Sequence, residues 1–133
     1  VMIGAWKMPW NKQLPGLPEE KEMNKKLAWS EQSHTIDEVG STYTIQGLDL
    51  NYAGVILGPS VKYRDGKIVF DPSCSANKDV KNARTLSDGT KKKFGKLLIR
   101  NEVNVLMTRG IDGLYIYACD EELRKALKEA KEK

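Results

Sequence analysis

Short apolar runs separated by turn residues dominate the chain from residue 38 onward, and they predict the strands of a sheet. The run YAGVILG (52–58) is continuously apolar, which is typical of a strand covered on both faces of a parallel sheet. GLYIYAC (113–119) predicts another such strand, and EVGSTYTI (38–45) is rich in the Val, Thr and Tyr that strands favour. VKYRDGKIVF (61–70) places Arg-Asp-Gly-Lys between two β-rich halves and predicts a hairpin.

Helical spacing appears twice in the second half of the chain. In 91–109 the apolar positions 94, 97 and 98 share one helical face, Ser87 or Thr90 can cap the start, and Gly110 is placed to end the helix. In 120–133 the apolar positions 123, 126, 127 and 130 form one face behind the N-cap residue Asp120. The polar stretch 71–90 between the hairpin and the first helix predicts a loop or a mobile insertion.

The first 37 residues follow neither period. They contain three Pro and three Trp, which predict an extended segment pinned by indole rings. VMIGAW (1–6) can form a strand and 19–27 a short polar helix. The tryptophans could stack on bases, but anchoring this segment to a core is the favoured interpretation.

The predicted order is strand, strand, hairpin, helix, strand, helix. This order predicts an α/β fold with a mostly parallel sheet, an inserted β-hairpin and flanking helices. We expect two parts: an irregular Trp/Pro-rich segment over 1–37 packed on the domain, and the domain itself over 38–133.

Composition narrows the chemistry. The 133 residues carry 40% hydrophobic and 30% charged residues and a formal net charge of +4, which permits nucleic-acid contact without arguing for it. Two distant cysteines, Cys74 and Cys119, and the single His34 predict no metal site; buried free thiols and a solvated histidine are expected. No apolar run approaches a membrane span, so we expect a cytoplasmic protein without a membrane partner, and the start at Val1 suggests a fragment of a longer chain.

Complete catalytic motifs are missing from the sequence. There is no GxxxxGK[ST] phosphate loop, no GxGxxG after a strand, no GxSxG elbow and no HExxH. A complete enzyme is therefore not expected from these residues alone.

Two stretches are similar to motifs V and VI of superfamily 1 helicases. YTIQGLDLNYAGVILG (43–58) resembles motif V and the strand behind it, and NVLMTRGIDGLYIYA (104–118) resembles motif VI and its strand. The chain also resembles a bacterial family of uncharacterised ATP/GTP-binding proteins with a helicase-like core over about residues 1–120. That likeness rests on W-x-x-P-W (6–10), DEVGS (37–41), the Arg-Asp-Gly hairpin and Thr-Arg-Gly (108–110). The resemblance implies a RecA-like domain of the P-loop NTPase type, the C-terminal one of a pair.

The resemblance also implies roles for individual residues. Arg109 matches the motif VI arginine, which acts as an arginine finger on the γ-phosphoryl group. The alternative for Arg109 is a cap at a helix end or a surface ion pair. Gln46, Gly47 and Asp49 match nucleotide-site positions, although Asp49 replaces the usual glutamate with a shorter side chain. Their alternatives are a loop amide, a tight turn and a turn cap.

Nucleic-acid contacts are implied at Ser41 and Thr44, where motif V hydroxyls often touch the backbone; satisfied strand residues are the alternative. Tyr43 departs from the motif, which often has histidine there. A basic stretch over 78–100 could contact phosphates, or it could be a solvated surface. Its run Lys91, Lys92 and Lys93 is expected at a helix N-terminus, where positive charge is unfavourable.

The sequence thus predicts the C-terminal half of an ATP-dependent nucleic-acid helicase or translocase. Its partners would be nucleic acid and a Walker-motif N-terminal domain of the same polypeptide. ATP or another nucleoside triphosphate would bind with Mg²⁺ in the full-length parent, and none is expected on the fragment, which alone would be inactive. The alternative is a non-catalytic module that binds nucleic acid or protein.

Overall fold

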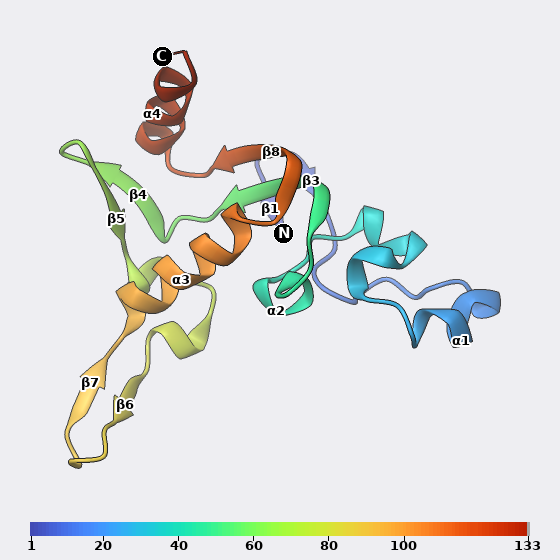
Figure 1. Ribbon diagram of the computed structural model, residues 1–133. Helices are drawn as coiled ribbons and strands as arrows, with labels where there is room; N and C mark the ends of the chain where they lie inside the picture. The colour runs from blue at the N-terminus through green and yellow to red at the C-terminus, as the bar shows by residue number, and fades with distance from the viewer. Residues whose placement is uncertain (133) are drawn as a thin grey trace. The chain divides into compact units, whose positions relative to one another are not determined.

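The computed structural model describes residues 1–132 and divides the chain into two compact units, Val1–Asp49 and Leu50–Lys133 (Figure 1). Each unit is described by itself below. Within the described residues, no helix has the length and apolar character needed to cross a bilayer.

The first unit contains little regular structure, as predicted for most of its length. Its strands and helices are β1 (Met2–Ile3), β2 (Trp6–Lys7), α1 (Lys21–Asn24) and α2 (Thr42–Ile45), joined by single 3₁₀ turns at Pro18–Glu20, Trp29–Glu31 and Ser33–Asp37. The stretch expected as one strand at 1–6 is a small antiparallel hairpin, β1–β2. The helix expected over 19–27 is shorter, a 3₁₀ turn followed by α1.

The prediction of a strand over 38–45 is wrong, because that stretch forms an isolated bridge and then a helical turn. Val39 pairs with Trp10 in a parallel bridge, and α2 begins directly after Ser41. The Thr44 hydroxyl accepts a hydrogen bond from Ser41 N–H at 2.8 Å and donates to the Ser41 carbonyl at 2.9 Å. Local hydroxyl-to-backbone bonds of this kind compete with sheet pairing, so β-rich composition did not decide the structure here.

The second unit holds the remaining strands and helices. They are β3 (Leu50–Leu57), β4 (Val61–Arg64), β5 (Lys67–Phe70), β6 (Ala83–Thr85), β7 (Lys91–Lys93), α3 (Gly95–Met107), β8 (Gly110–Ala118) and α4 (Glu121–Lys131). Strands β3 and β8 are parallel, from Leu50 opposite Gly110 to Leu57 opposite Ala118. The parallel pairing expected for the two apolar runs is therefore confirmed, while β4–β5 and β6–β7 are antiparallel. The unit is mixed α/β, and its assignment to the RecA-like class stays a prediction.

The predicted hairpin at 61–70 is confirmed, with its turn at Arg-Asp-Gly-Lys. Arg64 pairs with Lys67 and closes a two-residue loop in which Asp65 and Gly66 have φ of 50° and 74°. Positive φ at both loop residues is the type I′ geometry, which matches the twist of the flanking strands.

The prediction for 71–93 is corrected in two places. Single 3₁₀ turns form at Pro72–Cys74 and Lys78–Val80, and residues 83–93 form an antiparallel hairpin, β6–β7. Lys91–Lys93 are strand β7, so they do not begin the helix, and Thr90 belongs to the hairpin turn instead of capping. Helix α3 begins at Gly95 behind Phe94, whose side chain makes no capping bond.

Both predicted helices are present. Helix α3 ends at Met107, and Gly110 begins β8 instead of ending the helix; a Cβ at Gly110 would collide with the Gly113 carbonyl. Asp120 caps α4 as predicted, accepting a bond from Leu123 N–H at 3.0 Å.

One face of the β3–β8 pair and the apolar sides of α3 and α4 enclose the core of the second unit. Its buried members are Val55, Leu57, Val61, Val80, Ile99, Ala118 and Leu123. On the other face Tyr52 and Tyr115 are exposed. Cys119 is half-buried, but Cys74 is exposed, which corrects the expectation of two buried thiols. His34, expected in solvent, is half-buried and would meet a Cβ added at Gly16 at 3.1 Å.

Candidate functional site

Arg109 lies at the junction between the end of α3 and the start of β8. Its backbone carbonyl accepts a hydrogen bond from Leu50 N–H at 2.8 Å, so the starts of the two parallel strands are tied together. Asp49 is the residue immediately before Leu50 in the chain. The two motif-like segments thus lead into neighbouring parallel strands that begin at the same end of the pair.

The Arg109 side chain is held against the carboxyl end of α3. Its Nε–H donates to the Val105 carbonyl at 3.1 Å, and its Nη2 donates to the Thr108 hydroxyl at 3.1 Å. Thr108 Oγ1 in turn donates to the Asn104 carbonyl at 2.9 Å. These bonds satisfy carbonyls that a helix end leaves unpaired, and a cation is favourable at that pole of the helix dipole. The half-buried arginine therefore acts as a helix cap in this conformation.

Gln46 and Gly47 form the centre of a tight turn between α2 and β3. Leu48 N–H bonds to the Ile45 carbonyl at 3.1 Å. Gln46 has φ −59° and ψ 129°, and Gly47 has φ 81°. These angles are those of a type II turn, whose third position needs positive φ and so favours glycine. A Cβ at Gly47 would meet nothing within 4 Å, so backbone conformation, and not close packing, calls for glycine here.

Most residues of this turn lie at the surface. Gln46, Gly47 and Asp49 are exposed, while Leu48 between them is half-buried. Because 38–45 is not a strand, the turn follows helix α2 and precedes strand β3.

Ser41 is buried at the start of the α2 turn, at 8% exposure, and the Thr44 hydroxyl is bonded to the Ser41 backbone. The exposed side chain of this turn is Tyr43, at 74% exposure.

Glu38 organises the segment that leads into the turn. It is only 5% exposed, and its carboxylate accepts bonds from Leu14 N–H at 2.5 Å, Lys12 N–H at 2.9 Å and the Trp29 indole N–H at 3.0 Å. Burial by itself would raise the pKa of Glu38, but these hydrogen bonds outweigh it and hold the pKa below its ordinary value. The Trp29 ring also lies against Gly40, where a Cβ would come within 2.7 Å. Trp29 is thus an anchor, as favoured from the sequence.

Sequence reasoning did not single out Glu38. The available signal is weak: a single carboxylate directly before the apolar Val39 and Gly40.

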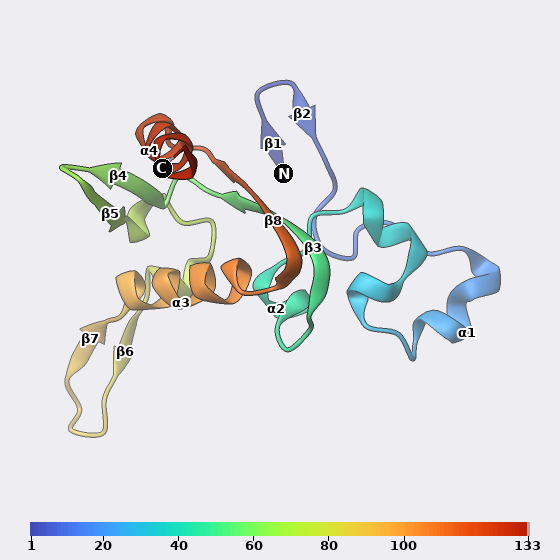
Figure 2. The ribbon, with the colours of Figure 1, turned by 45° about the horizontal axis from the view of Figure 1, so that its top comes forward.

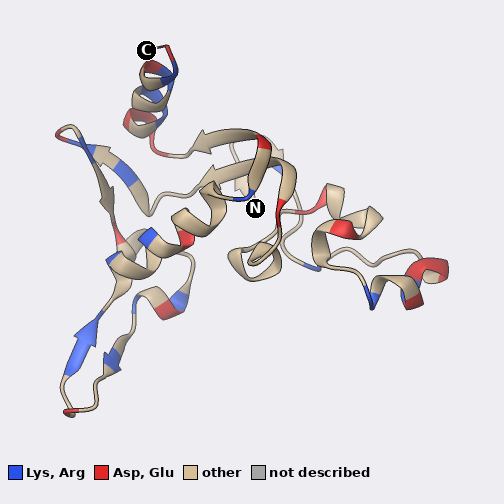
Figure 3. Cartoon of the chain, viewed as in Figure 1, with Lys and Arg blue, Asp and Glu red and all other residues tan. Residues whose placement is uncertain are grey.

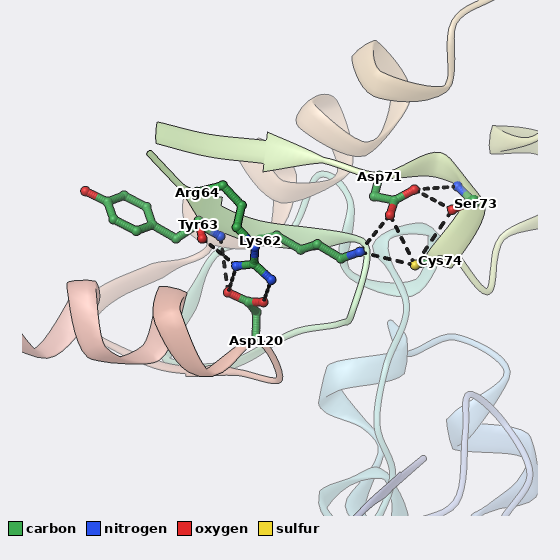
Figure 4. A network of polar contacts seen from close by, with 7 residues as sticks. All are labelled: Lys62, Tyr63, Arg64, Asp71, Ser73, Cys74 and Asp120. Carbon is green, nitrogen blue, oxygen red and sulfur yellow. Dashed lines mark hydrogen bonds and ion pairs between the residues drawn. The ribbon is translucent and has the colours of Figure 1, made fainter. Parts of the chain in front are cut away.

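Two ion-pair clusters fix the β4–β5 hairpin within the second unit (Figure 4). Arg64 makes a bidentate pair with Asp120 at 3.0 and 2.8 Å, which joins the hairpin to the start of α4. Lys62 Nζ lies 2.7 Å from Asp71 and 3.4 Å from the Cys74 sulfur. The bond from Arg64 lowers the pKa of Asp120, and the bond from Lys62 lowers that of Asp71.

Lys91, Lys92 and Lys93 lie in β7, at the opposite end of α3 from Arg109. Their side chains are exposed. The structure therefore separates this basic run from Arg109 and does not gather the two in one site.

Comparison with known proteins gives one family and one relative. The family whose model matches, over residues 1–120, is described as Schlafen group 3, DNA/RNA helicase domain. An uncharacterised protein of Saccharomyces cerevisiae, YPL245W, is 48% identical over 106 residues, which cover 74% of this chain and 22% of that protein. The chain thus spans about a fifth of the length of this relative. No solved structure matches.

Proposed function

The chain belongs to the Schlafen group 3 DNA/RNA helicase domain family, and from this premise we propose that it is the C-terminal RecA-like domain of a superfamily 1 helicase-like NTPase. In the longer parent protein it would couple nucleoside triphosphate hydrolysis to movement on a nucleic acid. A Walker-motif domain of the same polypeptide would supply the phosphate loop and the Mg²⁺ ligands. ATP is the expected nucleotide, or another nucleoside triphosphate.

The observation that carries the proposal is the position of Arg109. It follows a helix, precedes a strand, and is linked through its carbonyl to Leu50, directly behind the Gln46–Asp49 turn in sequence. An arginine finger needs a permanently charged, planar group on a rigid support that can reach a triphosphate from a second domain. The helix end and the β8 backbone supply that support.

The cap conformation of Arg109 is compatible with this role, because its hydrogen bonds can be exchanged. Hydrogen bonds made by a charged group are worth about 1.5–3 kcal/mol each. A finger lowers the barrier to phosphoryl transfer by about 4–7 kcal/mol, equivalent to 10³–10⁵ in rate. The two sizes are similar, so the guanidinium would leave the Val105 carbonyl only when phosphate oxygens offer replacement bonds. Arg109 would then be held away from the nucleotide until the cleft closes.

The turn before β3 would form the other contribution of this chain to the nucleotide. Gly47 would allow close backbone approach, Gln46 would act near the γ-phosphate, and Asp49 would accept a bond from the ribose or order the phosphate end. The α2 segment, with Ser41 and Thr44, would lie near the nucleic-acid backbone. Since Ser41 is buried and Thr44 is bonded to backbone, contact there would require the turn to open or would use backbone groups.

The test is steady-state phosphate release by the longer protein at saturating nucleic acid and Mg²⁺. Arg109→Ala should lower kcat by about 10³–10⁵, with a much smaller change in KM. Arg109→Lys should recover little, because an ammonium lacks the planar fork. Arg100→Ala is the matched control: Arg100 is an exposed arginine within α3, the helix that Arg109 follows, and its loss should leave kcat within about twofold.

The isolated chain 1–133 should release phosphate only at the background rate. Magnesium-dependent turnover by this chain that is lost in Arg109→Ala would overturn the shared-site proposal. An unchanged kcat for Arg109→Ala in the longer protein would overturn the finger. With nucleic-acid binding retained, that result would favour a non-catalytic binding module.

A further inference from the structure

The β6–β7 hairpin and the first turn of α3 hold more positive charge than the chain as a whole. Residues 81–96 contain six lysine or arginine residues and one aspartate, a formal charge of +5 against +4 for all 133 residues. The rest of the chain is therefore slightly negative. In Figure 3 strand β7 is a continuous blue arrow facing the blue segment of β6. Every residue from 81 to 93 is exposed.

The strand register places these charges on both faces of the hairpin. Arg84 lies directly opposite Lys92, so two cations share one face. Lys91 and Lys93 lie on the other face, two residues apart and hence separated by about 7 Å along the strand. Like charges directly opposite each other destabilise a strand pair. Hairpin stability alone does not account for this arrangement.

Nothing in the described residues offsets this repulsion with a carboxylate. The ion pairs of residues 1–132 involve none of the hairpin cations. Asp88 accepts bonds from the Thr90 backbone at 2.9 Å and the Thr90 hydroxyl at 2.7 Å, so its carboxylate is used by the turn. The nearest compensation is Lys92 over the Phe94 ring, 5.7 Å from its centroid.

The base of the hairpin is fixed, although its strands are open to solvent. Val80, just before β6, is 1% exposed and belongs to the core. Gly95, just after β7, is buried, and a Cβ there would collide with the Val80 carbonyl. Beyond this base β6 and β7 pair only with each other among the described strands, and both views show them extending away from the start of α3 (Figures 1 and 2).

We propose that the β6–β7 hairpin is an arm that binds the phosphate backbone of a nucleic acid, independently of base sequence, through Arg84, Lys91, Lys92 and Lys93. The arm goes beyond the nucleotide site proposed for Arg109 and does not depend on it. A polyanion converts the uncompensated repulsion of Arg84 and Lys92 into attraction. Both faces of the arm are cationic and neither is apolar, which suits a phosphate backbone better than a membrane surface, where one face would be apolar. Membership of a DNA/RNA helicase domain family favours the same partner.

The experiment is a titration of chain 1–133 with fluorescent dT₃₀, rU₃₀ and a 20-base-pair DNA duplex, at several salt concentrations from 50 to 200 mM. The test variant replaces Arg84, Lys91, Lys92 and Lys93 by Gln. Each phosphate contact adds about 0.7 to the log–log salt slope for a single strand and about 0.9 for duplex. The slope should therefore fall by about 3 on a strand or by about 4 on duplex. Over this salt range the wild type should lose about 50-fold more affinity than the variant on a strand, or about 150-fold more on duplex.

A matched control removes the same number of charges elsewhere in the second unit. It replaces four exposed lysines by Gln, namely Lys67, Lys125, Lys128 and Lys131. The control should keep the wild-type slope to within about one contact. If the cations only stabilise the hairpin, the test variant should melt at a lower temperature; we expect an equal or higher Tm, because repulsion is removed.

Three results would overturn the proposal. The test variant could keep the wild-type salt slope, or the control could lose as much of it. The third result is that the wild type binds vesicles containing phosphatidylserine as strongly as it binds the oligonucleotides, and that the test variant loses both to the same extent. The comparison of dT₃₀, rU₃₀ and the DNA duplex shows which form of nucleic acid the hairpin binds.

Discussion

Glu38→Gln should destabilise the first unit selectively, because the buried carboxylate accepts three hydrogen bonds that an amide cannot all accept. In the wild type Lys12 N–H and the Trp29 indole N–H share one carboxylate oxygen, and Leu14 N–H bonds to the other. A glutamine keeps one oxygen but presents an NH₂ group in place of the other. One buried donor then faces another donor, and the remaining bonds lose the negative charge that strengthens them.

The size of the effect follows from these losses. Bonds to a charged acceptor are worth about 1.5–3 kcal/mol, neutral ones about 0.5–1.5 kcal/mol, and a buried donor left unpaired costs about 1–3 kcal/mol. Glu38→Gln should therefore lower the free energy of unfolding by about 2–4 kcal/mol. With an m-value of about 1–3 kcal/mol per molar, the urea midpoint should fall by about 0.7–4 M.

The distribution of chromophores allows each unit to be followed separately. Trp6, Trp10 and Trp29 all belong to the first unit, so tryptophan fluorescence reports on it. The long helices α3 and α4 belong to the second unit and dominate the far-UV circular dichroism signal. In urea titrations the fluorescence transition should move in Glu38→Gln. Glu19→Gln, the same change on an exposed side chain of the same unit, should change the free energy of unfolding by less than about 0.5 kcal/mol.

The pH dependence gives a second readout with a defined sign. Because the folded pKa of Glu38 is lowered, its stabilisation is present above the unfolded value, near 4.3, and is lost as pH falls through the folded value. Wild-type fluorescence midpoints should decline below about pH 4.3 more steeply than those of Glu38→Gln. A fluorescence midpoint in Glu38→Gln equal to that of the wild type would refute the reasoning, and so would identical acid profiles.

Three further substitutions probe the second unit by thermal unfolding followed at 222 nm. Ile99→Ala removes a side chain that is 1% exposed and should lower the free energy of unfolding by about 2–5 kcal/mol. Leu97→Ala, on the exposed side of the same helix, should lower it by less than about 1 kcal/mol, and equal effects would contradict the burial of Ile99. Gly110→Ala forces a Cβ onto the carbonyl three residues later and should cost about 1–3 kcal/mol, so an unchanged Tm would show that the backbone relaxes freely. Asp120→Ala should lower Tm more than Asp120→Asn, since Asn still caps α4; the reverse order would count against the cap.

Elements set by local chemistry could be predicted from the sequence. Arg-Asp-Gly-Lys specified the turn of β4–β5, because few residues besides Gly and Asp adopt positive φ at two successive positions. Asp120 specified the start of α4 for a similarly local reason, a carboxylate bonding an amide three residues on. The apolar runs of β3 and β8 predicted parallel strands covered on both faces; the two strands do pair in parallel, but one face, with Tyr52 and Tyr115, is exposed.

Elements that depend on distant partners could not be predicted. Lys91–Lys93 form a strand because they pair with 83–85 across the turn, and the Asp88-Gly89 pair in that turn lacks the β-rich flanks that identify the hairpin at 61–70. The role of Glu38 could not be recognised either, since its three donors come from residues 9 to 26 positions away.

The candidate site shows the same division. The sequence by itself determined the identity of the motif residues and the need for glycine at position 47, since a type II turn is local chemistry. Only the tertiary structure decided that the basic run forms a hairpin separate from Arg109. The helical turn at 41–45 and the Arg109 cap rest on bonds between residues no more than four apart, and the cap was one of the alternatives that the sequence left open. The physical reason is that strand pairing and burial depend on partners distant in sequence, whereas turns and caps depend on neighbours within about four residues.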